Sequence, residues 1–439
     1  MGQTSKPPRV PAASLRGRIA IWGGQAAKSA SRLLGRGSGG MIGGTVALRA
    51  YPQILSELAA GRESVLITGT NGKSTTTRMV RGALVTAGAV ASNVRGDNLP
   101  SGVTAALMDD RYAPLAALEV DEMHLPAVAS QVKPAAIILL NLSRDQLDRV
   151  GEIGTVEKRL RQAVNENPQA QIIANCDDPL IVSAAWDAPK VTWVAAGSGW
   201  GADSTSFPRG GGRVIRSDDD WWVEDNDEYR RPQPQWWVET HSNPDGEPGA
   251  QTSHLVNSDG QKIALELSLP GRVNRTNAAM AVAAVNSLGV DPVKAAATLT
   301  AVNDVAGRYQ HYSVDGRIVH LLLAKNPAGW QEALEMLNPE VSQVIIAVNG
   351  QVPDGEDLSW LWDVDFEALR RHAPATLLSA GERGADLAVR LEYANLPNQL
   401  IATPYEAIHR CRPGRVEILA NYTSFRDLLG DLKTHGYGE

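Results

Sequence analysis

The sequence predicts an α/β fold with two domains: a central P-loop domain built on a parallel sheet, followed by a smaller, Rossmann-like α/β domain. Short apolar runs such as 64–68 (SVLIT) and 135–142 (AAIILLNL) alternate with helical patterns, which is typical of parallel strands buried on both faces. A glycine-containing turn directly follows the first run. The alternation restarts near Gly307, and a chain of 439 residues exceeds what one hydrophobic core usually serves.

Residues 1–45 are expected to form a tail and an amphipathic helix. The first twelve residues are rich in proline, so we expect them to be disordered. Residues 15–34 mix Ile19 and Trp22 with basic residues and lack the features of a signal peptide, which favours a helix. We expect this helix to pack on the protein's own body, with contact to a membrane surface as the alternative. Residues 35–44 are expected to form a glycine-rich loop.

The central domain is expected to span residues 46–305, with strands at 113–120 and 135–142 and a helix at 271–288. Residues 197–260 are rich in Gly, Asp and Pro, and we interpret them as an insertion of short antiparallel strands. The insertion contains no cysteine, so a four-cysteine zinc ribbon is excluded there and no zinc is expected. As a hypothesis, four tryptophans supply the packing in this insertion that a zinc ion supplies in a zinc ribbon: Trp221, Trp222, Trp236 and Trp237.

The second domain is expected to span residues 306–439. Its strands are expected at 317–323, 343–348, 376–379 and 416–419, with helices between them.

Composition restricts the class of function. With 42 basic and 49 acidic residues, the net charge of −7 argues against broad nucleic-acid binding. Two cysteines far apart in sequence exclude a disulfide framework and fit a reducing cytoplasm. The sequence has no run of 18 apolar residues, so we expect a cytoplasmic protein, with the inner face of the plasma membrane as the alternative site.

The turn at 69–75 (GTNGKST) has the composition of a phosphate-binding loop. Its glycines allow backbone amides to turn inward around phosphate oxygens, and the following helix adds a favourable dipole. Lys73 can reach the β- and γ-phosphates, and Ser74 can offer its hydroxyl to Mg²⁺. Ile67 occupies the first glycine position of the general pattern. The flanking strand and helix nevertheless favour a nucleotide site over an ordinary turn.

Acidic residues end the next strand, at Glu119, Asp121 and Glu122. Ligands collect at the carboxyl ends of strands in open α/β sheets, so these residues can supply the acid that a metal ion needs. A solvated acidic turn is the alternative. The segment 141–148 (NLSRDQLD) ends the following strand and is expected to contribute to the same crevice.

Together, GTNGKSTT, LEVDE, NLSRDQLDR and GRVNRTNA resemble the motifs of the Mur ligase family, which joins amino acids to peptidoglycan precursors with ATP. LEVDEMHLP, LAKNPAGWQE and DGEDLSWLWDVDFE resemble one branch more closely, the MurT branch of bacterial lipid II isoglutaminyl synthases. The resemblance covers the chain from about residue 35. It implies a GatD-like glutamine amidotransferase as partner, lipid II as substrate, and ATP with Mg²⁺. The chain would phosphorylate the D-glutamate α-carboxylate, and ammonia from the partner would then give D-isoglutamine.

The resemblance also assigns roles to residues. Asn274 and Asn277 would lie near the adenine, and Arg308 would reach the nucleotide from the second domain. Lys325 would face the cleft and stabilise charge on the transferred phosphoryl group, with a solvated lysine as the alternative. Glu119 would bind Mg²⁺ together with Ser74. Phosphate and metal would be held by the loop residues Gly69, Thr70, Asn71, Gly72, Lys73, Ser74 and Thr75.

An aspartate near residue 357 would complete the partner's Cys-His pair in this family. We favour Asp357, with Asp354 and Asp363 as alternatives, and a capped turn is the non-catalytic interpretation. Gln146 and Leu322 stand where several Mur ligases have histidine and aspartate, which leaves a second metal site open. The alternative functions are an amino-acid-adding Mur ligase, a folylpolyglutamate-type ligase and a non-catalytic nucleotide-binding scaffold.

Overall fold

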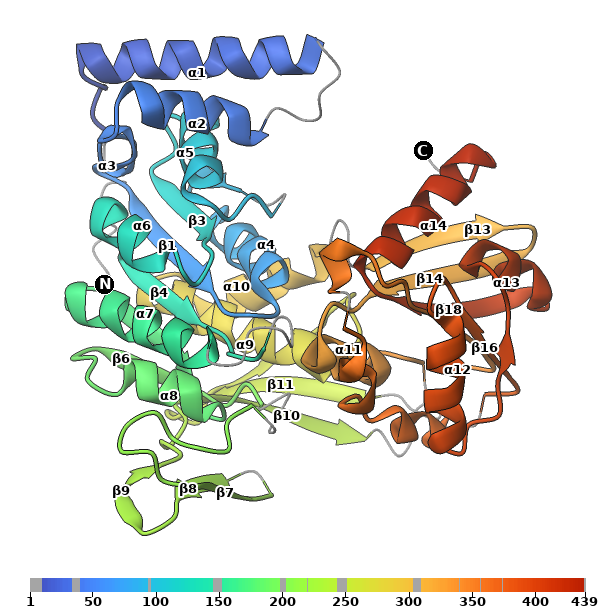
Figure 1. Cartoon of the computed structure of the whole chain (residues 1–439). Helices are drawn as coiled ribbons and strands as arrows, with labels where there is room; N and C mark the ends of the chain where they lie inside the picture. Colours follow the sequence, from blue (N-terminus) through green and yellow to red (C-terminus); the bar gives the residue numbers. More distant parts are fainter. Residues whose placement is uncertain are drawn as a thin grey trace. The chain divides into compact units, whose positions relative to one another are not determined.

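The computed structural model divides the chain into two compact units, each built on one main sheet (Figure 1). Unit 1 comprises residues 1–142, 153–268 and 273–303, and unit 2 comprises residues 143–152, 269–272 and 304–439. The structure describes residues 10–33, 40–93, 96–144, 152–197, 203–218, 220–242, 251–302, 309–338, 340–355, 357–372 and 374–437. The domain boundary expected at about 305 lies outside these residues and stays a prediction.

Unit 1 contains a nine-stranded sheet with the strand order β12-β11-β10-β6-β5-β4-β1-β3-β2. In this order, each pair of neighbouring strands from β10 to β2 is parallel, whereas the pairs β10–β11 and β11–β12 at one edge are antiparallel. All residues of β3 and β4 are buried, which explains their continuous apolar runs. The bounds are β1 Glu63–Thr68, β2 Val90–Ser92, β3 Leu115–Glu119, β4 Ala136–Leu139, β5 Gln171–Asn175, β6 Val191–Val194, β10 Trp236–Ser242, β11 Gln251–Asn257 and β12 Lys262–Ala264.

Helices pack on this sheet. Leu66, Leu118 and Ile137 join buried side chains from several helices in one large core, and α4 contacts β1 and β3 outside that core. The helices of unit 1 are α1 Leu15–Leu33, α2 Gly40–Ala50, α3 Ile54–Ala59, α4 Lys73–Leu84, α5 Pro100–Asp109, α6 Leu125–Val132, α7 Glu152–Glu166, α8 Pro179–Ala185, α9 Arg272–Ser287, α10 Pro292–Thr298 and the 3₁₀ helix η1 Leu299–Ala301.

The stretch interpreted as an insertion contains two kinds of strand. β7 (Val214–Ser217), β8 (Asp220–Val223) and β9 (Asn226–Arg230) form a separate antiparallel sheet, as expected. In contrast, β10 and β11 extend the main sheet, because Ala195 N donates to Trp236 O at 2.8 Å and aligns β10 with β6. The paired tryptophans at 236 and 237 therefore belong to the main sheet, which corrects their expected place in the insertion.

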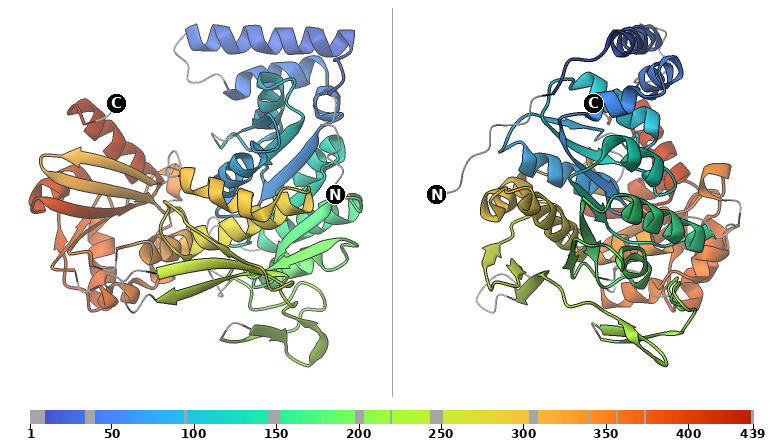
Figure 2. Two further views of the ribbon diagram at one scale, coloured as in Figure 1. Left: turned by 180° about the vertical axis from the view of Figure 1, so that it is seen from behind. Right: turned by 90° about the vertical axis from the view of Figure 1, so that its left-hand side faces the viewer.

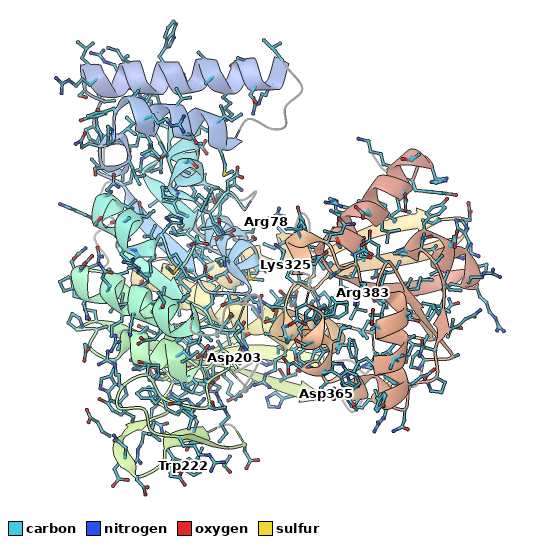
Figure 3. The ribbon with its side chains drawn as sticks, in the orientation of Figure 1. Arg78, Asp203, Trp222, Lys325, Asp365 and Arg383 are labelled. Atoms are coloured by element: carbon cyan, nitrogen blue, oxygen red, sulfur yellow. The ribbon has the colours of Figure 1, made fainter. Side chains whose placement is uncertain are left out.

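The small sheet has a core of its own around Trp221. This side chain is 2% exposed and packs with Phe207, and its Nε1 donates to Cys176 O at 2.9 Å. Trp222 is 39% exposed and is labelled on this sheet in Figure 3. Of this pair, only Trp221 has the packing role that we proposed for tryptophan.

Unit 2 contains a six-stranded sheet with the order β13-β14-β18-β15-β16-β17, in which only β13 is antiparallel to its neighbour. The four expected strands are confirmed within one or two residues as β14, β15, β16 and β18. The bounds are β13 Tyr309–Val314, β14 Arg317–Leu323, α11 Pro327–Glu335, β15 Gln343–Ala347, η2 Val352–Asp354, η3 Ser359–Trp362, η4 Phe366–Arg371, β16 Thr376–Ala380, α12 Gly384–Tyr393, β17 Gln399–Leu400, α13 Pro404–Arg410, β18 Gly414–Ala420 and α14 Tyr422–Thr434.

The N-terminal segment forms two helices, and Figure 2 shows α1 lying along α2 in both views. The amphipathic helix is confirmed, whereas residues 40–44, expected in a loop, begin α2. The glycines in this stretch allow α2 to pack closely against its neighbours, and they do not mark a loop. A β-carbon on Gly43 would lie 3.0 Å from Gly24 O, and one on Gly44 would collide with Ser101 O. The tail expected to be disordered lies mostly outside the described residues. Among those residues, no helix has the length and apolar character needed to span a bilayer.

Candidate functional site

The loop between β1 and α4 has a backbone that requires its glycines. Gly69 (φ 138°) and Gly72 (φ 82°) adopt a conformation that residues with a β-carbon rarely adopt. There is also no room for one, because a β-carbon on Gly69 would lie 2.8 Å from Leu140 Cβ. Gly72 is the N-cap of α4 and supplies no side-chain cap. The start of α4 therefore presents backbone amides and the positive end of its dipole, which suits an anion.

Lys73, the first residue of α4, folds back along the loop. Its Nζ donates to Gly69 O at 2.5 Å and to Thr70 O at 3.3 Å. It also forms an ion pair with Glu122 Oε1 at 2.8 Å, and the two side chains are only 9% and 13% exposed. Burial raises the pKa of Glu122, while the neighbouring Lys73 ammonium lowers it. A cation is thus fixed beside the phosphate loop, and Glu122 is its carboxylate partner.

Ser74 and Glu119 place a hydroxyl beside a carboxylate. Ser74 Oγ donates to Glu119 Oε2 at 2.9 Å, and Glu119 is 2% exposed at the end of β3. Asn93 holds the backbone of Glu119 through two hydrogen bonds of 2.8 Å, from Asn93 Nδ2 to Glu119 O and from Glu119 N to Asn93 Oδ1. Oxygen donors of these two kinds suit Mg²⁺, which is usually held by one or two protein groups together with substrate phosphate. The donor set therefore fits the metal ion that the motif implies.

Asn141, at the end of the next strand, clamps the loop from the other side. Its Oδ1 accepts from Asn71 N at 2.9 Å, and its Nδ2 donates to Asn71 O at 3.2 Å. Its backbone oxygen accepts from Thr70 N at 2.9 Å. The prediction that this strand end contributes to the same crevice is confirmed for Asn141, while residues 145–148, with Gln146, lie outside the described residues.

Helix α9 brings two more predicted residues to unit 1. Asn274 and Asn277 are both buried, and the Asn277 carboxamide lies directly against the Gly72 backbone, since a β-carbon on Gly72 would be 2.9 Å from Asn277 Oδ1. Asn277 is therefore at the phosphate loop itself. The role of both residues beside an adenine stays a prediction.

In unit 2, Lys325 follows β14 (Figure 3), and its Nζ lies 5.3 Å from the centre of the Tyr422 ring. Asn326 caps α11, because its Oδ1 accepts from Gly329 N at 2.8 Å. The Lys-Asn-Pro sequence thus joins a strand end to a helix start. The proposed action of Lys325 on a phosphoryl group stays a prediction, and Arg308 lies outside the described residues.

The three candidate aspartates have different surroundings. Asp354 accepts hydrogen bonds from the backbone N of Thr423, at 3.0 Å, and from its hydroxyl, so it caps the start of α14. Burial raises the pKa of Asp354. Asp363 is half-buried just after η3. The capped-turn interpretation therefore applies to Asp354.

Asp357 is exposed and borders a hollow of about 480 Å³ in unit 2. Its Oδ1 accepts from Ser359 N at 2.8 Å, so the second oxygen can accept a further hydrogen bond. Trp362 and Arg383 line the same hollow. Among the three candidates, Asp357 is the carboxylate best placed to meet a group from outside the chain.

Sequence reasoning did not single out the asparagines that position Glu119, or the Lys73–Glu122 pair. A pattern could have identified Asn93, because it directly follows β2, which is parallel to β3 and ends at the same edge of the sheet. Asn98, whose Nδ2 lies 3.5 Å from Glu119 Oε1, is in a loop and has no such pattern.

Comparisons with known proteins agree with this architecture. The family model of the Mur ligase middle domain matches residues 67–204, and that of the MurT ligase C-terminal domain matches residues 323–425. The chain is 27% identical to the lipid II isoglutaminyl synthase (glutamine-hydrolyzing) subunit MurT of Streptococcus pneumoniae, over 95% of this chain and 97% of the relative. It is 26% identical to the subunit of the same name from Staphylococcus aureus, over 92% and 95%.

Solved structures share the fold. MurF from Acinetobacter baumannii superimposes with a TM-score of 0.64 at 18% identity, covering 89% of this chain and 80% of that one. A pseudomurein peptide ligase type C from Methanothermus fervidus gives 0.63 at 16% identity, covering 87% and 81%. The middle-domain model includes the phosphate loop and Glu119, and the C-terminal model includes Lys325 and Asp357. The chain therefore belongs to the Mur ligase family and is a ligase of its MurT branch.

Proposed function

We propose that the chain is the synthetase subunit of a glutamine-dependent ligase that converts the D-glutamate α-carboxylate of lipid II into a carboxamide. The single observation that carries the ATP-dependent step is the grouping of Lys73, Ser74 and Glu119 at the uncapped start of α4. The choice of substrate and of amide donor follows the name of the MurT relatives, which align with almost the whole chain.

The residues suggest the following division of work in the first step. The amides of the loop and Lys73 bind the triphosphate, and Ser74 and Glu119 hold Mg²⁺, which supplies charge neutralisation for phosphoryl transfer. A carboxylate oxygen of the substrate bonds to the γ-phosphorus as the bond to the β-phosphate oxygen breaks. The products of this step are an acyl phosphate and ADP.

In the second step ammonia attacks the acyl carbon. The carbon–oxygen bond to phosphate breaks, phosphate leaves, and the nitrogen loses a proton, which gives the carboxamide. We propose that a separate glutamine amidotransferase supplies the ammonia, because both cysteines are buried and burial raises the pKa of their thiols, which disfavours the thiolate that glutamine hydrolysis needs. In this proposal Asp357 is the carboxylate that completes the Cys-His pair of that partner.

The test combines the purified chain, a glutamine amidotransferase, lipid II, glutamine and Mg-ATP, with mass spectrometry of the product. Amidation that depends on ATP, and a hydroxamate when hydroxylamine replaces ammonia, are the expected results. A matched reaction offers free amino acids and a peptidoglycan precursor without the partner, and it should give no lengthened peptide. A lengthened peptide would identify an amino-acid-adding ligase, and absence of Mg-ATP binding would refute the proposal altogether.

A further inference from the structure

Helix α1 exposes an apolar stripe on the surface of unit 1. Leu15, Ile19, Trp22 and Leu33 are 64–89% exposed, and their spacing of four, three and eleven residues places them on one face of a helix. The opposite face is buried on unit 1, at Gly17, Ala20, Ile21, Gly24 and Ser31. An outward row of large apolar side chains is unusual on a soluble surface and indicates an interaction site.

The stripe is held in a fixed orientation. Gly24 and Gly43 bring α1 and α2 into direct backbone contact, with room for no side chain on Gly24. On the inner side, Lys28 Nζ donates to Asp109 Oδ1 at 2.6 Å, which ties α1 to the end of α5. The exposed apolar row therefore has a fixed position on the surface of unit 1, and Figure 1 shows α1 as the outermost helix of that unit.

The charge of α1 is opposite in sign to the net charge of the chain. The chain has a net charge of −7, yet α1 contains four basic residues and no acidic one. Arg16 lies on one side of the apolar stripe and Arg18 and Arg32 on the other, by the periodicity of the helix, and all three are exposed. Apolar side chains with a tryptophan, flanked by arginines, match the boundary between acyl chains and anionic headgroups.

We propose that α1 docks unit 1 on the surface of an anionic lipid bilayer, with Leu15, Ile19, Trp22 and Leu33 inserted at headgroup depth. This inference rests on the proposed function in one respect: a lipid-linked substrate is presented at such a surface. The arginines give the attraction to anionic lipid, worth about fivefold in affinity for each one. The apolar row gives the part of the binding that salt does not screen.

The experiment is co-sedimentation of the full chain with vesicles of phosphatidylcholine alone, or with phosphatidylglycerol replacing about a third of it. The full chain should bind the anionic vesicles and should bind the neutral ones about 100-fold less. The double variant Ile19→Ala/Trp22→Ala should lose about tenfold in binding, and Arg16→Gln/Arg18→Gln should lose about 25-fold, at low salt only. Trp222→Ala is the matched control, because Trp222 is an exposed tryptophan on the small sheet, far along the chain from α1 (Figure 3).

Binding of the anionic vesicles that survives Ile19→Ala/Trp22→Ala, or its absence in the parent, overturns the proposal. Self-association in analytical ultracentrifugation that the same double variant abolishes, without vesicle binding, would assign the stripe to a second copy of the chain. Mg-ATP binding of every variant, measured by titration calorimetry, should equal that of the parent. A parent protein that binds vesicles but not Mg-ATP would support this inference and refute the proposed function. A parent protein that binds Mg-ATP but not vesicles would refute this inference and leave the proposed function standing.

Discussion

Replacing Lys73 with alanine should weaken Mg-ATP binding about 10- to 100-fold, and the structure predicts a stability change that must be separated from this loss. The substitution leaves Glu122 with a side chain only 13% exposed and without its ion-pair partner. Removing one partner of a fully buried pair costs about 3–5 kcal/mol. Because both side chains retain some exposure, we expect a smaller decrease in the free energy of unfolding, about 1–3 kcal/mol.

A double variant separates the loss of Mg-ATP affinity from the loss of stability. In Lys73→Ala/Glu122→Gln the unpaired carboxylate is gone, so the unfolding free energy should return to within about 1 kcal/mol of the parent. Affinity for Mg-ATP should remain about 10- to 100-fold lower, because the lost hydrogen bond is to a charged group. Titration calorimetry measures the affinity, and scanning calorimetry measures the stability of the same samples.

The pH dependence gives an independent check. Burial raises the pKa of Glu122 and Lys73 opposes this rise, so the pKa should rise further in Lys73→Ala. The folded variant then binds the proton more tightly than the unfolded chain does. Its deficit in stability is therefore largest above the folded-state pKa and shrinks as the pH falls through it. A deficit that does not change with pH, or a double variant that binds Mg-ATP as the parent does, would refute the reasoning.

Five other substitutions test three separate parts of the chain. Gly72→Ala should cost about 1–2 kcal/mol, because of the left-handed backbone, and should abolish Mg-ATP binding; normal binding would contradict the loop geometry. Trp221→Ala should lower the free energy of unfolding by about 3–5 kcal/mol in a denaturant titration and Trp222→Ala by less than about 0.5, while a chelator leaves the parent's unfolding unchanged. Asp357→Asn should stop amidation with glutamine but not with ammonium chloride, whereas Asp354→Ala should lower the free energy of unfolding by about 1 kcal/mol through loss of the α14 cap. Loss of the glutamine-dependent reaction in the Asp354 variant alone would move the partner's acid to Asp354.

Much of the fold could be predicted from the sequence because its strands are buried on both faces. Runs such as 135–142 and 343–348 are almost wholly apolar, and a continuous run of that length between helices is typical of a strand inside a parallel sheet. The strands at 236–242 and 251–257 were harder, since half-exposed strands can extend a large sheet or form a small one. The backbone contact between Ala195 and Trp236 decides between the two, and it leaves no pattern in the sequence.

The phosphate loop was predictable for a different reason. Its chemistry uses a local stretch of chain, so glycine, lysine and serine occur together and the flanking elements are visible. Glu119 was predictable from its place at a strand end, but Asp121 and Glu122 shared that property. Only the structure separates them, because Glu119 contacts Ser74 and Glu122 contacts Lys73.

Ile67 departs from the general phosphate-loop pattern, and its position explains why the loop tolerates it. The residue is fully buried inside β1, opposite Glu119 in the register with β3, and its backbone oxygen accepts from Val120 N at 2.9 Å. Glycine is needed where φ is positive, and the positive values begin at Gly69. At position 67 a strand residue is needed instead, because its backbone pairs β1 with β3 close to the end of β1. That pairing aligns the carboxylate of Glu119 with the start of α4, so in this chain Ile67 contributes to the alignment of Glu119 with Ser74.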